Sequence, residues 1–364
     1  MKKIIINGRF LLHRVTGVER YAREILAELD RIVQPGEIEM AVPPETEEIP
    51  PYENIKVVRV GKLHNRLWEH VSFPAYVRKK GGISLNLCMV APLPSPGIVC
   101  IHDARTRARP QDFSRAFLLW YRLLLWNETK RAKKILTVSE FSREELCRYY
   151  PGCSDRIEVI PCAWQHFERI GYDEIALERY GLEKGRYFFS MCSREPNKNA
   201  RWIAGAARGK PGMVFAVAGG VNKTVFADDQ GFEAPENMRL LGRVSDEEAK
   251  TLMRDCRAFL FPSFYEGFGI PPLEALSVGA KVISANTSSL SEVLRDSAYY
   301  IDPDNADVDL EELLSGPVGP KEHALGQYSW EESARKLYAL LRSIGTGQRK
   351  TDGCESESTP AGVS

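Results

Sequence analysis

The sequence predicts an α/β protein in which two domains are each built on a parallel, Rossmann-like sheet. The chain has 364 residues, enough for about two domains of ~150 residues each. Short β-branched runs alternate with segments of helical periodicity, an alternation typical of parallel sheets covered by helices. The alternation occurs in two series, separated by a polar stretch between residues 167 and 183.

The first series starts at residues 4–7, a β-branched run that predicts a buried strand. Gly17 then precedes a helix in which apolar residues recur at helical spacing up to Leu29. Further strands are predicted at 55–60, 98–101 and 135–138, and a long helix at 113–134.

The second series predicts strands at 187–191, 214–218, 238–241, 258–261 and 281–284, with helices between them. We therefore place an N-terminal domain at residues 1–168 and a C-terminal domain at 175–328. A final amphipathic helix at 329–344 can cross back to the first domain. The tail, residues 345–364, is polar and without periodicity, which predicts disorder.

The composition excludes several classes of protein. Lys and Arg together number 49, and Asp and Glu together also number 49, so the formal net charge is zero. The chain therefore lacks the excess of basic residues that is typical of a nucleic-acid-binding protein. None of the eight cysteines forms a C-x-x-C pair, which argues against a zinc ribbon and for reduced thiols. The N-terminal apolar run is too short for a signal peptide, and no segment is long enough to span a membrane. We expect a cytoplasmic protein.

The most informative segment follows the strand predicted at 258–261. It reads FYEGFGIPPLEA, a Gly-containing loop leading into a helix with prolines in its first turn. Glu266 lies on the loop and Glu274 in the helix, eight positions later. The residues alone leave two interpretations open. One is a simple strand–loop–helix corner, and the other is a ligand site at the carboxyl end of a parallel strand.

This segment resembles the Glu-x-x-x-x-x-x-x-Glu signature of retaining GT-B glycosyltransferases of the large family 4 (group 1) type. Within it, the segment is most similar to bacterial mannosyltransferases of surface-polysaccharide synthesis. The similarity runs over nearly the whole chain and ends before the tail. It implies the GT-B fold, two Rossmann-like domains facing a cleft, with the nucleotide sugar on the C-terminal domain and the acceptor on the N-terminal one.

The resemblance also assigns roles within the segment. It implies that Glu266 contacts the donor sugar and that Glu274 binds the nucleotide ribose. The backbone N–H groups of Phe268, Gly269 and Ile270 would approach the sugar and the phosphates.

A second segment, SMCSREPNKN at residues 190–199, lies between a strand and a helix. A departing nucleotide diphosphate develops negative charge, which a nearby cation stabilises. The resemblance gives this role to Lys198. The family's phosphate arginine aligns near Cys192, two residues before Arg194, so Arg194 either substitutes for it or is a solvated loop residue.

Four further residues gain a role from the resemblance, and Asp103, next to one of them, gains one from the chemistry of a carboxylate. His102 would lie beside the donor sugar, and Asp103 would orient the acceptor or take its proton. Gly17 would let the backbone approach the donor phosphate, while Arg243 and Val244 would pack on the nucleobase. Structural alternatives stay open, among them a hydrogen-bonded core histidine and an ordinary helix start.

Two patterns resemble metal sites but are interpreted otherwise. Residues 302–304 spell D-P-D, which in a Pro-containing turn predicts a solvated turn. The segment HNRLWEHVSF at 64–73 carries two histidines and a glutamate, but fits a helix with Leu67 and Val71 facing inward. We therefore predict no metal. No G-x-G-x-x-G indicates a dinucleotide, so we predict no cofactor besides the nucleotide sugar, which is a substrate.

The acceptor side carries a cluster of cations. Arg105, Arg107 and Arg109 could bind an anionic group such as a lipid-linked diphosphate, or could belong to a solvated loop. The helix predicted at 113–134 combines aromatic residues with terminal lysines and an arginine. It could lie on a membrane surface, or its apolar residues could pack in the core.

Together these residues predict a metal-independent retaining hexosyltransferase of bacterial polysaccharide, O-antigen or capsule biosynthesis. GDP-mannose is the favoured donor, and a saccharide or lipid-linked oligosaccharide is the acceptor. A membrane surface is a candidate partner, at the inner face of the plasma membrane. Two other classes stay open: a sugar-nucleotide epimerase on the same fold, and a non-catalytic, nucleotide-binding partner subunit.

Overall fold

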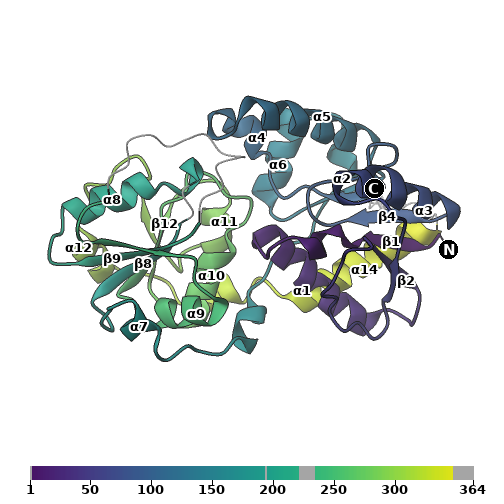
Figure 1. Cartoon of the computed structure of the whole chain (residues 1–364). Coiled ribbons are helices and arrows are strands. Elements are labelled where there is room, and N and C mark those ends of the chain that lie inside the picture. The colour runs from purple at the N-terminus through teal and green to yellow at the C-terminus, as the bar shows by residue number, and fades with distance from the viewer. Residues whose placement is uncertain (1, 193–194, 221–233, 347–364) are drawn as a thin grey trace, which may run out of the picture.

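The structure, a computed structural model, describes residues 2–192, 195–220 and 234–346. Figure 1 shows two α/β lobes side by side, one from each half of the chain. The predicted fold class, two parallel-sheet α/β domains, is confirmed. The tail predicted to be disordered spans residues 345–364, and residues 347–364 lie outside the described ranges.

The N-terminal domain is built on a seven-stranded sheet in which every strand pairs in parallel with its neighbours. The strand order is β3-β2-β1-β4-β5-β6-β7. The strands are β1 (Ile4–Asn7), β2 (Ile38–Val42), β3 (Lys56–Arg59), β4 (Ile83–Asn86), β5 (Ile98–Cys100), β6 (Lys134–Thr137) and β7 (Ile157–Val159).

Helical segments connect these strands. The longer ones are α1 (Gly17–Ile32), α3 (Phe73–Lys79), α5 (Arg115–Arg131) and α6 (Glu140–Tyr149). The shorter ones are η1 (Gly8–Leu12), α2 (Asn65–Leu67), η2 (Trp68–Ser72), α4 (Arg105–Ala108), η3 (Pro110–Asp112) and η4 (Ser154–Arg156). Between the domains lies η5 (Gln165–Arg169).

The C-terminal domain is built on a six-stranded parallel sheet of order β10-β9-β8-β11-β12-β13. Its strands are β8 (Tyr187–Met191), β9 (Val214–Ala218), β10 (Met238–Gly242), β11 (Ala258–Phe261), β12 (Val282–Ala285) and β13 (Tyr299–Ile301). Its helical segments are α7 (Ala176–Arg179), η6 (Pro196–Lys198), α8 (Ala200–Arg208), α9 (Asp246–Asp255), α10 (Ile270–Ser277), α11 (Leu290–Leu294), α12 (Leu310–Ser315) and α13 (Glu322–Leu325).

Each sheet has one point where the strand order reverses. In the first sheet this switch point lies between β1 and β4, and in the second between β8 and β11. Loops on the two sides of a switch point leave in opposite directions, which opens a crevice at the carboxyl ends of the strands. The fold therefore offers one ligand crevice on each domain.

The last helix, α14 (Trp330–Thr346), joins the two domains. Figure 1 shows it running from the C-terminal lobe to lie beside α1. The hydroxyl of Tyr338 donates to Glu37 at 2.8 Å, and the Lys2 N–H donates to the Gly345 carbonyl at 3.1 Å. The chain thus crosses between the domains twice, once at η5 and once at α14.

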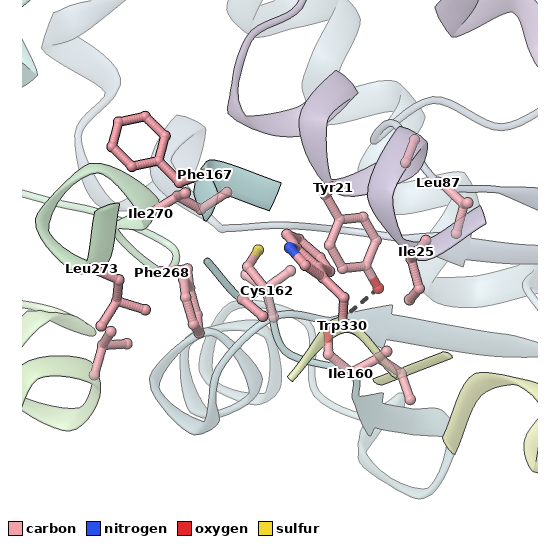
Figure 2. Close-up of a cluster of buried hydrophobic side chains, with 14 of the residues drawn as sticks. Tyr21, Ile25, Leu87, Ile160, Cys162, Phe167, Phe268, Ile270, Leu273 and Trp330 are labelled. Carbon is pink, nitrogen blue, oxygen red and sulfur yellow. Dashed lines mark hydrogen bonds between the residues drawn. The ribbon is translucent and has the colours of Figure 1, made fainter. Parts of the chain in front are cut away.

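The two crossings pack together in a buried apolar cluster (Figure 2). Tyr21 from α1 lies beside Trp330 from α14, with ring centroids 6.1 Å apart, and its hydroxyl donates to the Ile160 carbonyl at 3.3 Å. Phe167 and Phe268 belong to the same cluster. The core is therefore continuous from the first domain through the crossing segments into the second.

One predicted helix face is wrong. The segment at 64–73 is helical, but Leu67 and Val71 are 63% and 52% exposed, while Trp68 and Phe73 are buried. The cause is η2, a π-helical turn of five residues. A π turn holds more residues than an α turn, so the inward face shifts along the sequence.

Candidate active site

The switch point of the C-terminal sheet brings two sequence-predicted residues together. Lys198 ends η6 after β8, and Glu266 lies on the loop after β11. Lys198 Nζ donates to Glu266 Oε1 at 2.7 Å. Burial alone lowers the pKa of Lys198, but Glu266 and Glu195 outweigh it and raise that pKa. The site therefore holds a fixed cation next to a carboxylate.

The loop that carries Glu266 is held rigidly by two serines. The Glu266 N–H donates to Ser288 Oγ at 2.9 Å, and Ser289 Oγ donates to the carbonyls of Glu266 and Phe268, each at 3.0 Å. Gly269 ends the loop with φ +101°, a value that favours glycine, and α10 begins at the next residue. The N-terminus of α10 is thereby placed beside Glu266.

Glu274 lies in α10, where a second pair of residues orients it. His166 Nε2 lies 2.8 Å from Glu274 Oε1, and Trp330 Nε1–H donates to His166 Nδ1 at 3.2 Å. Since the indole N–H is only a donor, Nδ1 must be the acceptor, and Nε2 carries the proton that it donates to the carboxylate. The hydrogen-bond pattern thus assigns one tautomer to His166 and directs it at Glu274.

His102 approaches this site from the N-terminal domain. It follows β5, its ring meets the Tyr21 ring edge-on at 4.9 Å, and its Nε2 lies 2.8 Å from the Leu87 carbonyl. A carbonyl only accepts, so Nε2–H is the donor and Nδ1 is the acceptor nitrogen. Burial lowers the pKa of His102, although the Leu87 carbonyl and Asp103 act against it, and the lowered pKa favours the neutral imidazole.

The two domains meet at Gly267, one residue after Glu266. A Cβ at this position would lie 2.4 Å from the carbonyl oxygen of His102. Ser139 and Ser142 from the start of α6 both donate to the Gly267 carbonyl, at 2.6 and 3.1 Å. The Glu292 carboxylate accepts the N–H groups of residues 140 and 141, each at 2.9 Å. The loop of Glu266 is therefore docked directly against His102.

Other sequence-predicted residues lie around this centre. Asp103 is next to His102, and its Oδ1 accepts the N–H of Arg105 at 2.9 Å. Burial raises the pKa of Asp103, and that hydrogen bond offsets part of the rise. Gly17 is the first residue of α1, and Thr16 before it forms a capping box with Glu19.

The remaining predicted donor contacts are placed as follows. Phe268 and Ile270 are buried, and the Phe268 ring meets Tyr328 edge-on at 4.9 Å. Arg243 and Val244 follow β10, so they lie at the same carboxyl edge as Lys198 but at the far side of the sheet. Arg194 lies outside the described residues.

The three arginines of the predicted acceptor cluster each contact other side chains. Arg109 Nε donates to Asp112 at 3.0 Å, and Arg105 lies 3.6 Å from the same carboxylate. Arg105 also donates to Glu195, on the donor-side loop, at 3.0 Å. Arg107 is directed at a tyrosine hydroxyl. Carboxylates thus pair with two of the three cations, and their assignment as acceptor-binding residues stays a prediction.

The D-P-D pattern at residues 302–304 lies at the surface. Asp302 accepts the N–H of Asp304 at 2.9 Å, and both are exposed in a turn. Across residues 2–192, 195–220 and 234–346, no group of three or more His, Cys, Asp or Glu side chains could hold a metal ion. Among the helices in these ranges, none combines the length and apolar character needed to cross a bilayer.

Two parallel-sheet domains, joined by a crossing helix and docked at their carboxyl edges, define the class: this is a GT-B fold. Residues 174–330, within the C-terminal half of the chain, match the family described as Glycosyl transferases group 1. The resemblance stated from the sequence is thereby confirmed.

Three similarities illustrate the relationship. The chain is 30% identical over 253 residues to O-antigen chain mannosyltransferase B of Escherichia coli, covering 65% of this chain and 63% of that protein. It is 28% identical over 211 residues to O-antigen chain mannosyltransferase RfbU of Salmonella typhimurium, covering 57% of each. The matched region thus spans less than two thirds of these relatives. The fold is similar to sucrose-phosphate synthase from Thermosynechococcus elongatus, with a TM-score of 0.69 and 15% identity over 96% of this chain and 100% of that one.

Proposed function

We propose that this chain is a retaining hexosyltransferase that moves a sugar from a nucleotide sugar to a saccharide or lipid-linked oligosaccharide. One observation carries the proposal: the Lys198–Glu266 pair lies at a sheet switch point and is docked, through Gly267, against His102. Glu274 follows in the helix that begins at the same loop. A cation, a sugar-binding carboxylate and a ribose-binding carboxylate thus share one edge.

The residues suit a front-face displacement. The bond from the anomeric carbon to the phosphate oxygen breaks, and the acceptor oxygen bonds to the same face of that carbon. The acceptor proton passes to an oxygen of the departing diphosphate. Lys198 and the N-terminus of α10 stabilise the diphosphate charge, so this role requires no metal. Asp103 orients the acceptor, and neutral His102 accepts a hydroxyl of the donor sugar at Nδ1.

The proposed donor is GDP-mannose, and the proposed process is bacterial surface-polysaccharide biosynthesis in the cytoplasm. Support comes from the two relatives above, whose names describe O-antigen chain mannosyltransferases. The proposed base contacts are Arg243 and Val244, and Arg194 is the candidate second phosphate cation. Neither the base nor the sugar follows from the Lys198–Glu266 pair, so the donor must be identified by binding.

A thermal-shift screen tests the donor site directly. Purified protein is heated with GDP, UDP, dTDP, ADP or CMP and with their sugars, and we expect the largest rise in Tm with GDP and GDP-mannose. A ligand at 100 times its Kd stabilises the fold by about 2.7 kcal/mol. Glu274→Ala should abolish the rise, whereas Glu183→Ala, an exposed glutamate of the same domain, should not.

Product analysis then tests the reaction. We expect transfer to a mannoside acceptor, unaffected by EDTA, with the anomeric configuration of the donor kept in the product. Inverted product stereochemistry would refute the mechanism. Epimerisation of the free nucleotide sugar would indicate an epimerase, and nucleotide binding without transfer would indicate a partner subunit.

We also propose that α5 places the enzyme on an anionic membrane surface, the inner face of the plasma membrane. Leu119, Leu123 and Trp126 are 75%, 48% and 51% exposed and recur at helical spacing. Exposed cations flank this stripe along the same helix: Arg115, Arg122, Lys130 and Arg131. Apolar side chains between basic ones fit the boundary between headgroups and acyl chains.

Vesicle flotation tests the membrane proposal. Wild type should float with phosphatidylglycerol vesicles at low salt, and Leu123→Ser with Trp126→Ser should abolish flotation. Val318→Ser, which changes an exposed valine of the other domain, should float like wild type. Flotation of the double variant at the wild-type level would overturn the assignment of α5.

A further inference from the structure

A cavity of about 370 Å³ lies at the switch point of the N-terminal sheet. It is lined by Asn7 at the carboxyl end of β1, by Leu87 just after β4, and by residues of η2 and α5. Small-molecule sites have volumes of about 300–1,000 Å³, so this one is of ligand size. Leu87 is also the residue whose carbonyl binds His102, which places the cavity next to the proposed reaction centre.

A buried carboxylate forms one wall of the cavity. Glu69 is 3% exposed and accepts from Asn7 Nδ2 at 3.0 Å and from Arg9 Nη1 at 3.2 Å. Burial raises the pKa of Glu69, and Arg9 and Asn7 act against the rise. Asn7 is in turn fixed by Asn86, at 3.1 Å. These bonds hold the carboxylate in one orientation, with its remaining acceptor capacity available to a ligand.

The charges of the lining balance. Its two arginines, Arg9 and Arg66, stand against two carboxylates, Glu19 and Glu69. Glu69 pairs with Arg9, and Arg66 lies over the Trp120 ring at 5.6 Å. An anionic group entering this space would therefore meet two carboxylates as well as the two arginines, one of them already paired with Glu69.

An aromatic wall and unpaired polar atoms complete the cavity. Trp120 of α5 lines it, and the His70 ring meets Trp120 edge-on at 5.9 Å. Burial lowers the pKa of His70, which favours the neutral form of its ring. Two buried lining atoms, Arg9 Nε and His70 Nε2, have no hydrogen-bond partner within the described part of the chain. A buried polar group without a partner is costly, so these atoms fit a site that receives hydroxyl groups.

We propose that this cavity binds an uncharged pyranose ring, the receiving end of the acceptor, with Trp120 against its C–H face and Glu69, Arg9 and His70 at its hydroxyls. The proposal rests on the proposed function and deepens it, because it gives the acceptor a charge class. The paired arginines at 105 and 109 then have no part in holding the acceptor ring. An anionic acceptor would carry its charge outside the cavity.

Ligand-observed NMR titrations test the charge class without any donor. The probes are the methyl α-glycosides of D-mannose, D-glucose and D-galactose, each compared with its uronate, in which a carboxylate replaces the CH₂OH group. We expect the best neutral glycoside to bind wild type at least about tenfold more tightly than its uronate. Equal or tighter binding of the uronate, or no binding of any neutral glycoside, would overturn the proposal.

Three variants locate the binding. Trp120→Leu should weaken the best neutral glycoside by about tenfold, whereas Tyr172→Leu, an exposed aromatic that lies against α9 of the other domain, should leave it unchanged. Glu69→Gln leaves Arg9 without a carboxylate, so it should weaken the glycoside and tighten the uronate. This reversal is a result that misfolding cannot produce. An unchanged preference in Glu69→Gln, together with unchanged affinity in Trp120→Leu, would refute the location.

A separate readout distinguishes this proposal from the proposed function. Nucleoside diphosphate binding, measured by thermal shift on the same variants, should stay at the wild-type level because the cavity lies on the other domain. Glycoside binding without any nucleotide binding would refute the transferase and leave the cavity assignment standing. Nucleotide binding with no glycoside binding would refute the cavity assignment alone.

Discussion

Replacing His166 should weaken nucleotide binding without any contact between that residue and the nucleotide. His166 is 2% exposed, donates to Glu274 at 2.8 Å, and accepts from Trp330 at 3.2 Å. Glu274 is 8% exposed and is the proposed ribose ligand. In His166→Ala the carboxylate loses the hydrogen bond that orients it, and in Trp330→Phe the imidazole loses the donor that fixes its tautomer.

The magnitude follows from the kind of bond that is lost. A hydrogen bond to a charged group contributes about 1.5–3 kcal/mol. If His166→Ala loses all of it in ribose binding, affinity falls by about 10- to 150-fold, since each 1.4 kcal/mol is tenfold. We expect Trp330→Phe to cost less, about 0.5–1.5 kcal/mol, because it removes a neutral hydrogen bond and keeps the buried ring.

The assay compares the nucleoside diphosphate that binds best with its 2′,3′-dideoxy analogue by calorimetry. Glu274 can act on the ribose hydroxyls only in the first ligand. The loss in His166→Ala should therefore appear with the ribonucleotide and be absent with the dideoxy analogue. Equal losses with both ligands would show that His166 acts through the fold alone and would refute the reasoning.

Three further predictions follow from single contacts. In Gly267→Ala the new Cβ should collide with the His102 carbonyl, separate the domains and lower kcat by at least about tenfold. The control is Gly212→Ala, whose Cβ would meet nothing within 4 Å. Equal kcat values for the two variants would contradict the docking of the domains at Gly267. Lys198→Ala should abolish sugar transfer while the protein stays folded, whereas the control Lys210→Ala should keep its transfer activity. Transfer activity in Lys198→Ala would refute the role of Lys198 as the cation that stabilises the diphosphate. Burial raises the pKa of Glu128 well above its usual value, so above about pH 4.5 the folded state binds a proton at Glu128 that the unfolded state has released. The free energy of unfolding of wild type should therefore fall as the pH rises above about 4.5, by up to about 1.4 kcal/mol per pH unit. Glu128→Gln should remove that share in denaturant titrations, and a wild-type-to-variant difference independent of pH would contradict it.

The donor edge could be predicted because its signals are local. Lys198 and Glu266 each follow a strand within a few positions, and parallel strands that run in one direction all end at one edge of a sheet. Lys198 and Glu266 are 68 positions apart in sequence, yet both follow strands that flank the switch point. Knowing the fold class was therefore enough to place them on one edge.

The positioning residues could not be predicted in this way. His166 and Glu274 are 108 positions apart, and His166 and Trp330 are 164 apart. The histidine lies in the segment between the domains, and the tryptophan starts the crossing helix. Only the path of the chain between the domains brings them together, and a single sequence carries no periodicity or spacing that reports it.

Charged residues limited the sequence interpretation in two places. The strand β2 was missed because Glu39 interrupts its apolar run, yet Glu39 is 1% exposed and pairs with Lys3 at 2.9 Å. For the arginine cluster, the sequence alone could not show the carboxylates that lie beside it. Arg105 pairs with a glutamate 90 positions away.

The loop of Glu266 contains two glycines that are needed for different physical reasons. Gly269 has φ +101°, so its side-chain-free backbone permits the turn into α10. Gly267 has no left-handed φ, and a side chain there would be allowed by the local backbone. It must be glycine because a Cβ would lie 2.4 Å from the His102 carbonyl, on the other domain. Glycine at position 267 is thus required by the contact between the domains. One residue of the donor loop is therefore determined by the surface of the N-terminal domain against which the loop packs.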